Sequence, residues 1–155
     1  MAVDRQPRVN TRTAAPNDRA ARAPQTQPII FFDGVCGMCN RFVDLVLRID
    51  RKELFRFAPL QGSTARELLP PLHEDPHEWS MIYLDERGIH DQSDASLEVY
   101  RRLGRAWALL GLLRFVPRVI RNRVYRVVAR NRYRWFGKQD TCRVPSADER
   151  RRFLP

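Results

Sequence analysis

The chain has 155 residues, a net charge of +10 and three cysteines, and its length suffices for one domain whose core needs neither disulfides nor a structural metal. Three unevenly placed cysteines exclude the disulfide framework of a small secreted protein and favour a reducing compartment. Without an apolar signal segment or a run of about 18 apolar residues, the sequence predicts a cytoplasmic protein that does not span a membrane.

Residues 1–28 show no pattern that would form a core. They contain five arginines and two aspartates among scattered Pro, Thr, Ala and Gln, and they resemble a transit peptide only loosely. Such a composition cannot bury enough apolar surface to fold. We therefore predict a disordered N-terminal tail.

Strands and helices alternate after the tail. Residues 29–32 are all Ile or Phe, which is typical of a strand buried on both faces. Apolar side chains recur at helical spacing over residues 38–49, so a helix begins at or near Cys36. Residues 54–58 alternate and predict a second strand, and residues 63–69 predict a short helix that two prolines stop.

A hairpin and a helix complete this part of the chain. Residues 79–84 and 89–92 predict two strands joined by a four-residue turn. The helix that follows is capped by Ser93 or Asp94 and ends at Gly104. The order βαβα, hairpin, helix predicts an α/β protein with a small mixed sheet and flanking helices, and it is the element order of the thioredoxin fold.

We expect the thioredoxin-like core to span residues 29–104 and a helical extension, residues 105–155, to pack on it. Gly111 and Pro117 should break this extension. An apolar stripe runs beside its arginines and consists of Val116, Ile120, Val124, Val127 and Val128.

Charge is divided unevenly between the two parts. Residues 29–100 carry seven basic and thirteen acidic residues, whereas residues 101–139 carry twelve basic residues and no acid. We expect the stripe to pack on the domain while the arginines face water or the acidic core. One alternative is that these Arg-rich helices contact a membrane surface or an acidic protein. Nucleic acid, suggested by arginines that alternate with Tyr125, Tyr133 and Trp135, is the least favoured partner.

The sequence FFDGVCGMCN, residues 31–40, places two cysteines three residues apart at the start of the first helix. A thiolate attacks a disulfide, so a redox cysteine needs a pKa lowered toward neutrality, and a helix N-terminus has this effect. We predict Cys36 as the nucleophile and Cys39, one turn deeper, as the resolving cysteine. Gly37 and Met38 carry no charge and little bulk, which we expect to leave the first sulfur accessible to another protein.

Two other interpretations of the cysteine pair stay open. Together with His73 and His77, Cys36 and Cys39 have the ligand types of a zinc site. However, 33 residues separate Cys39 from His73, against about 12 to 15 in a compact zinc finger. The histidines also lie in an acidic, proline-rich stretch that is typical of a solvated loop. The cysteines can equally be small buried apolar residues.

Asp33 and Cys142 are the remaining candidates near this chemistry. Asp33 can accept the proton of Cys39 as a general base, or it can form an Asx-type turn with Gly34 or cap the helix. Cys142 can be a third redox thiol only if the C-terminus folds back over the site, and we favour an ordinary buried or half-buried thiol. The residues predict no cofactor.

The motif Asp33-Gly34-x-Cys36-x-x-Cys39 resembles the signature of the DCC family of thiol-disulfide oxidoreductases. The resemblance covers residues 29–153. It includes Pro59-Leu60-Gln61, Ser93-Asp94-Ala95, Val116-Pro117, Tyr125-Arg126, Ala129-Arg130-Asn131-Arg132-Tyr133, Phe136-Gly137 and Cys142-Arg143-x-Pro145.

This resemblance implies a thioredoxin-like fold and the same two roles for Cys36 and Cys39. It also implies a protein or small-molecule disulfide or thiol as substrate. Val35 stands where thioredoxins have Trp, and Ser80 lies nearest the position of their cis-proline, so we expect peptide capture to be built differently. We predict a thiol-disulfide oxidoreductase; the alternatives are a noncatalytic docking module that uses the Arg-rich helices, and a zinc-binding protein.

Overall fold

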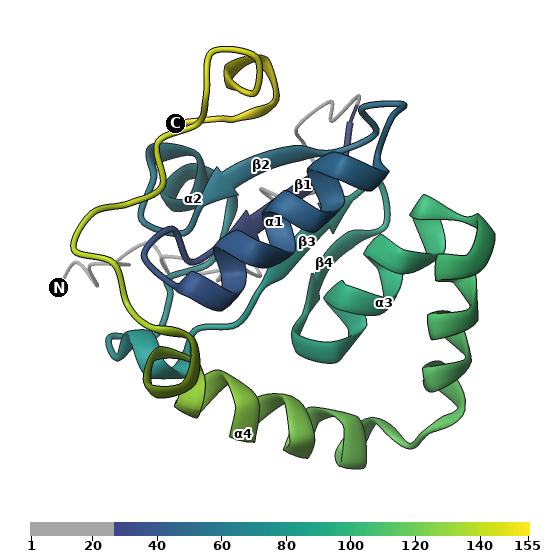
Figure 1. Ribbon diagram of the computed structural model, residues 1–155. Coiled ribbons are helices and arrows are strands. Elements are labelled where there is room, and N and C mark those ends of the chain that lie inside the picture. Colours follow the sequence, from purple (N-terminus) through teal and green to yellow (C-terminus); the bar gives the residue numbers. More distant parts are fainter. Residues whose placement is uncertain (1–26) are drawn as a thin grey trace, which may run out of the picture.

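The computed structural model describes residues 27–155, whose strands form one mixed sheet in the order β2-β1-β3-β4 (Figure 1). The central strand β1 (Ile29–Phe32) pairs parallel with β2 (Arg56–Pro59) and antiparallel with β3 (Ile82–Asp85). At the edge, β4 (Gly88–Asp91) pairs antiparallel with β3. The predicted mixed sheet with flanking helices is confirmed, and its pairing is consistent with the thioredoxin-like fold.

The apolar run of β1 supplies two cores, one on each face of the sheet. Ile29 and Phe31 pack on the face that α2 (Ser63–Leu68) covers. Their neighbours in β1 pack on the opposite face against α1 (Gly37–Ile49) and α3 (Gln92–Leu103). Because successive strand side chains point to opposite faces, a central strand between two layers must be apolar at every position.

Two local predictions in this core were wrong in detail. The hairpin turn has two residues and not four, because Asp85 and Gly88 still pair across the strands and Gly88 adopts the φ of +113° that the tight turn requires. The N-cap of α3 is Asp91. Ser93 and Asp94 instead direct their side chains to residues of the C-terminal extension.

The extension contains two long helical segments and a short one, the 3-10 helix η4 (Arg150–Arg152). The 3-10 helix η3 (Arg105–Phe115) continues through Gly111, so the predicted break there was wrong, whereas Pro117 does separate it from α4 (Arg118–Phe136). Every described helix is too short or too polar to cross a lipid bilayer. Apart from η4, residues 137–155 are irregular, so the predicted helical extension is helical mainly in its first part.

Most of the predicted apolar stripe does not pack on the domain, although Val116 and Val128 are half-buried and Val128 lines a small cavity between α4 and the domain. Ile120, Val124 and Val127 are 54, 60 and 52% exposed. The helix instead packs through polar and small side chains such as Tyr125 and Ala129. The reason is that α1, α2 and α3 already cover both faces of the sheet, so α4 meets α3, α1 and the loop before β3 (Figure 1).

The end of the chain packs beside β2. Phe153 stacks on Phe57 with ring centroids 5.4 Å apart, and the Leu154 N–H donates to the Phe57 carbonyl at 2.8 Å. At the other end, the predicted tail lies outside the described residues except for Gln27 and Pro28. Both accept hydrogen bonds from Arg56.

Candidate active site

The two cysteines lie where β1 passes into α1. The Asp33 carboxylate accepts the Val35 N–H at 3.2 Å, and the Asp33 carbonyl accepts the Cys36 N–H at 3.1 Å, so the chain turns at Gly34. Cys36 is the N-cap of α1, and its sulfur accepts the Cys39 N–H at 3.3 Å. The prediction that the helix begins at the CxxC motif is therefore confirmed.

The surroundings of the two sulfurs separate their pKa values. Hydrogen bonds from Cys39 to the Cys36 sulfur, together with the charge of Arg132, outweigh burial and lower the pKa of Cys36 to about 7. The same hydrogen bond and burial raise the pKa of Cys39 far above that of a free thiol. Around neutral pH it is therefore Cys36 that ionises, with about half of its thiol as thiolate, while Cys39 keeps its proton.

The Cys36 side chain is completely buried, and our expectation that it would be accessible was wrong. The cover is an extended segment, residues 137–143, which we call the strap. Its backbone pairs with the cysteine loop: Gly37 N–H donates to the Gly137 carbonyl at 3.1 Å, and Gln139 N–H donates to the Val35 carbonyl at 2.8 Å.

Two glycines of the cysteine loop permit this close approach. A Cβ at Gly37 would collide with the carbonyl oxygen of Phe136, and one at Gly34 would collide with the sulfur of Cys142. The small size of Gly37, which we read as leaving the thiol open to a partner, instead leaves room for the backbone of the same chain. Arg143 fastens the far end of the strap to α1 through an ion pair with Asp44.

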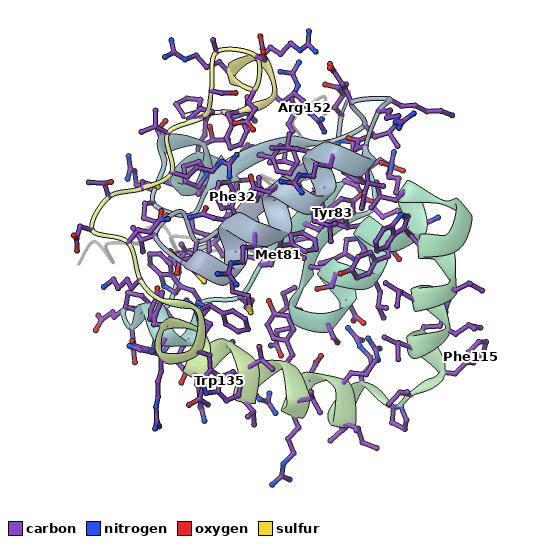
Figure 2. All side chains as sticks on the ribbon, in the orientation of Figure 1. Phe32, Met81, Tyr83, Phe115, Trp135 and Arg152 are labelled. Atoms are coloured by element: carbon purple, nitrogen blue, oxygen red, sulfur yellow. The ribbon has the colours of Figure 1, made fainter. Side chains whose placement is uncertain are left out.

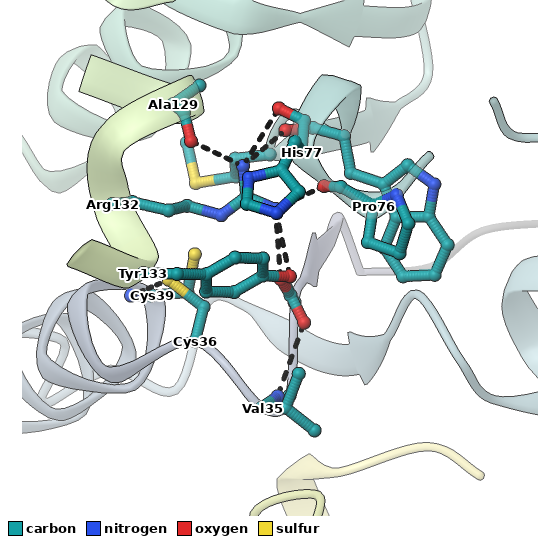
Figure 3. Close-up of polar contacts among 12 residues, drawn as sticks. Val35, Cys36, Cys39, Pro76, His77, Ala129, Arg132 and Tyr133 are labelled. Atoms are coloured by element: carbon teal, nitrogen blue, oxygen red, sulfur yellow. Dashed lines mark hydrogen bonds and ion pairs between the residues drawn. The ribbon is translucent and has the colours of Figure 1, made fainter. Parts of the chain in front are cut away.

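Asp33 is buried, and its carboxylate accepts four hydrogen bonds. One oxygen accepts from Val35 N–H and, at 2.7 Å, from the Gln61 amide. The other accepts from the Arg132 guanidinium at 3.0 Å and from the Tyr133 hydroxyl (Figure 3). Asp33 thus forms the Asx-type turn, and its lone pairs are fully engaged.

Arg132 lies at the centre of the site, and its role was not predicted from the sequence. It is 2% exposed, like its partner Asp33. Its guanidinium also donates to the carbonyls of Pro76 at 2.6 Å and Ala129 at 2.7 Å, so it ties α4 to the loop before β3 (Figure 3). The signal was present, since Gln61, Arg132 and Tyr133 lie in motifs quoted above for their resemblance, but nothing in the sequence assigned them to Asp33.

Cys39 faces the underside of α4. A cavity of about 30 Å³ separates them and is lined by Cys39, Met81, Tyr125 and Arg132 among others. The N–H of Met81, the residue before β3, donates to the Tyr125 hydroxyl at 2.9 Å. The described residues contain no cis peptide bond, so Ser80 does not reproduce the cis-proline of thioredoxins. Helix α4 occupies this side of the site instead.

Of the three remaining candidates, Cys142 and His77 lie close to this centre, whereas His73 is exposed in the loop before β3. The C-terminus does fold back, which places the Cys142 sulfur beside Gly34, where burial raises its pKa. His77 packs its ring against Tyr133, with centroids 4.9 Å apart. Within residues 27–155, no three Cys, His, Asp or Glu side chains come together in a way that could hold a metal ion, so the zinc alternative gains no support.

Comparison with known proteins identifies the family. The profile of the DCC1-like thiol-disulfide oxidoreductase family matches residues 30–138, which include both cysteines, Asp33 and Arg132. The chain belongs to this family. It is 36% identical over 129 residues to the uncharacterized protein YuxK of Bacillus subtilis (strain 168). The alignment covers 82% of this chain and 93% of YuxK.

A second DCC relative comes from a plant. The chain is 34% identical over 120 residues to a chloroplastic DCC family protein of Arabidopsis thaliana, covering 76% of this chain and 70% of that one. No solved structure gives a significant match. Membership of the DCC1-like family suggests a redox function with a thiol or disulfide substrate in general terms.

Proposed function

We propose that this protein is a thiol-disulfide oxidoreductase in which Cys36 is the nucleophile and Cys39 the resolving cysteine. The observation that carries the proposal is the hydrogen bonding of Cys39 to the Cys36 sulfur at the N-terminus of α1, which favours a thiolate on one cysteine and a thiol on the other. Family membership supports the same chemistry.

The exchange proceeds in two displacements. The Cys36 thiolate attacks one sulfur of a substrate disulfide, forms a mixed disulfide and expels the other substrate sulfur as a thiolate. Cys39 then loses its proton to solvent or to the departing thiolate, and its sulfur attacks that of Cys36. This attack breaks the mixed disulfide and releases the second substrate sulfur as a thiolate, so the products are the Cys36–Cys39 disulfide and a reduced substrate that has gained two electrons. Because Cys36 starts as a thiolate, one proton of the reduced substrate comes from Cys39 and the other from solvent.

Asp33 acts in this proposal by positioning the reacting groups. Its carboxylate already accepts four hydrogen bonds, two of them from Arg132 and Tyr133, and has no lone pair left for the proton of Cys39. In the ion pair that Asp33 holds, the positive charge of Arg132 favours the thiolate forms of both sulfurs, and the negative charge of Asp33 opposes this effect.

The strap must move before a substrate disulfide reaches Cys36, because attack requires the incoming sulfur to touch a side chain that is now buried. Its backbone hydrogen bonds to Val35 and Gly37 are the contacts that opening breaks.

We place the protein in the cytoplasm, where a reducing environment suits three unevenly spaced cysteines.

The test uses the reduced full-length protein and oxidised glutathione or a disulfide-bonded peptide. Cys36→Ser should abolish exchange, and Cys39→Ser should accumulate a mixed disulfide on Cys36 that mass spectrometry locates. Cys142→Ser is the control and should keep the parent rate, because the proposal gives this thiol no role. A Cys36→Ser protein as active as the parent, or an adduct found on Cys142 instead, would reject the proposal.

A further inference from the structure

The side of α4 that faces away from the domain exposes several large apolar side chains. Ile120, Val124 and Val127 follow the helical spacing of four and three residues and form one exposed stripe. At the corner where η3 meets α4, Phe115 is 80% exposed and points away from the domain (Figure 2). Contiguous exposed apolar groups of this kind mark a contact surface.

A basic stripe lies directly beside the apolar one. Arg123, Arg126 and Arg134 are exposed and follow one another at spacings of three and eight residues, which places them on a neighbouring line of the same helix. Arg130 lies on that line too and pairs with Glu78 at 3.0 Å. The segment 101–139 contains no acidic residue that could neutralise this stripe.

The inner side of α4 carries neither stripe and instead makes the contacts with the domain. Tyr125 and Arg132 bond to the loop before β3 and to Asp33. These contacts leave the apolar and basic stripes together on the side that faces away from the domain. An amphipathic helix with this division lies well in the boundary between lipid headgroups and acyl chains.

We propose that the outer face of α4, with the adjoining corner at Phe115, binds peripherally to the surface of anionic phospholipid bilayers. The apolar stripe enters the headgroup boundary, and the guanidinium groups beside it meet lipid phosphates. The bound helix would lie along the membrane, because no described helix is able to cross one.

Two other occupants fit the same residues less well. A second copy of the chain would bring two basic stripes without acids into one interface, where they repel. Nucleic acid needs several aromatic platforms for its bases, yet Tyr125 and Tyr133 point inward and bond to Met81 and Asp33, which leaves Trp135 as the most exposed aromatic side chain of α4. Charge and apolar character together therefore favour an anionic lipid surface.

The experiment measures flotation of the full-length protein with unilamellar vesicles. Binding to vesicles containing phosphatidylglycerol should exceed binding to pure phosphatidylcholine by tenfold or more, and it should weaken with salt. The variant Arg123→Gln/Arg126→Gln/Arg134→Gln should lose at least tenfold in affinity. The control Arg48→Gln/Arg51→Gln/Lys52→Gln removes the same charge from an exposed part of α1 and the turn after it, and should lose less than twofold.

A second variant tests the apolar stripe. Ile120→Ser/Val124→Ser/Val127→Ser replaces exposed side chains, so folding should be intact by circular dichroism while lipid binding falls tenfold or more. Three results would overturn the proposal: no preference for anionic vesicles, an equal loss in the α1 control, or self-association without lipid that the serine variant abolishes. Cys36→Ser should float like the parent, which separates this test from that of the proposed oxidoreductase.

Discussion

The side chain of Arg132 connects the stability of the protein to the chemistry of its cysteines. Its ion pair with Asp33 is buried on both sides, and the two residues are 99 positions apart in the chain. A buried pair is often no more stabilising than apolar residues of the same volume, but a single buried charge without its partner is costly. Arg132 also contributes to the lowered pKa of Cys36.

We therefore predict that Arg132→Gln destabilises the protein by about 3–5 kcal/mol in urea unfolding, because Asp33 is left as an uncompensated buried charge. The pKa of Cys36 should rise in the same variant, since a nearby positive charge is lost. Arg130→Gln is the control, because its pair with Glu78 is exposed and should contribute less than about 1 kcal/mol. Equal effects of the two substitutions would contradict a special role for Arg132.

A second residue-level prediction concerns pH. In a Cys142→Ser background, thiolate absorbance should titrate with a midpoint of about 7 for Cys36. Cys39→Ala removes the thiol that donates to Cys36 and should raise this midpoint, whereas Cys39→Ser keeps a hydroxyl donor and should raise it less. An unchanged midpoint in Cys39→Ala would show that the hydrogen bond is not the cause.

The lowered pKa of Cys36 also makes the stability of the folded protein depend on pH. The folded-state pKa of Cys36 lies below the value of about 8.5 for a free cysteine. Its thiolate thus stabilises the folded state fully above the unfolded-state pKa, and this share is lost as the pH falls through about 7.

Among the elements, β1 and α1 could be predicted because their signals are local. Four consecutive apolar residues indicate a strand between two layers, and the helical spacing after Cys36 indicates α1. The strap could not be predicted, because it is held by backbone hydrogen bonds to residues about 100 positions earlier. Backbone pairing of this kind has no periodic side-chain signature.

The strap leads to a prediction for the element as a whole. In Gly37→Ala the new Cβ meets the carbonyl of Phe136, the last residue of α4, and that of Gly137, the first residue of the strap, so both must shift away from the cysteine loop. We expect a loss of about 1–3 kcal/mol in stability and faster alkylation of Cys36 by a small reagent. The measurement compares alkylation rates in the folded protein by mass spectrometry.

Gly111→Ala is the matched control for this change. A Cβ at Gly111 meets no atom within 4 Å, so stability and alkylation should stay close to those of the parent. Should Gly37→Ala leave the alkylation rate of Cys36 unchanged, the strap would not be the barrier that protects this thiol.

Helix α4 shows where pattern analysis misleads. Periodicity correctly identified a helix with an apolar stripe, but it assumed that the stripe faces the core. Which side of a helix meets its domain depends on what the domain offers. Here the available surface presents Asp94 and Asp33, and these pair with Arg121 and Arg132 on the inner side of the helix.

At the scale of the whole molecule, the order of elements and the division of charge were readable from sequence. The acidic core and the basic extension do meet, through Asp94 with Arg118 and Arg121 and through Asp33 with Arg132. The position of each contact could not be predicted, because complementary charge shows that two parts attract each other but not which residues touch.

The strap is tied at both ends: the Gly137 N–H donates to the Tyr133 carbonyl of α4, and Arg143 pairs with Asp44 of α1 and lies over the Phe153 ring. Its release is consequently an event within one molecule, independent of protein concentration. The observed rate of exchange should equal the intrinsic rate of the bare thiolate multiplied by the fraction of molecules that are open. Anything that changes this fraction would tune the protein without touching either sulfur.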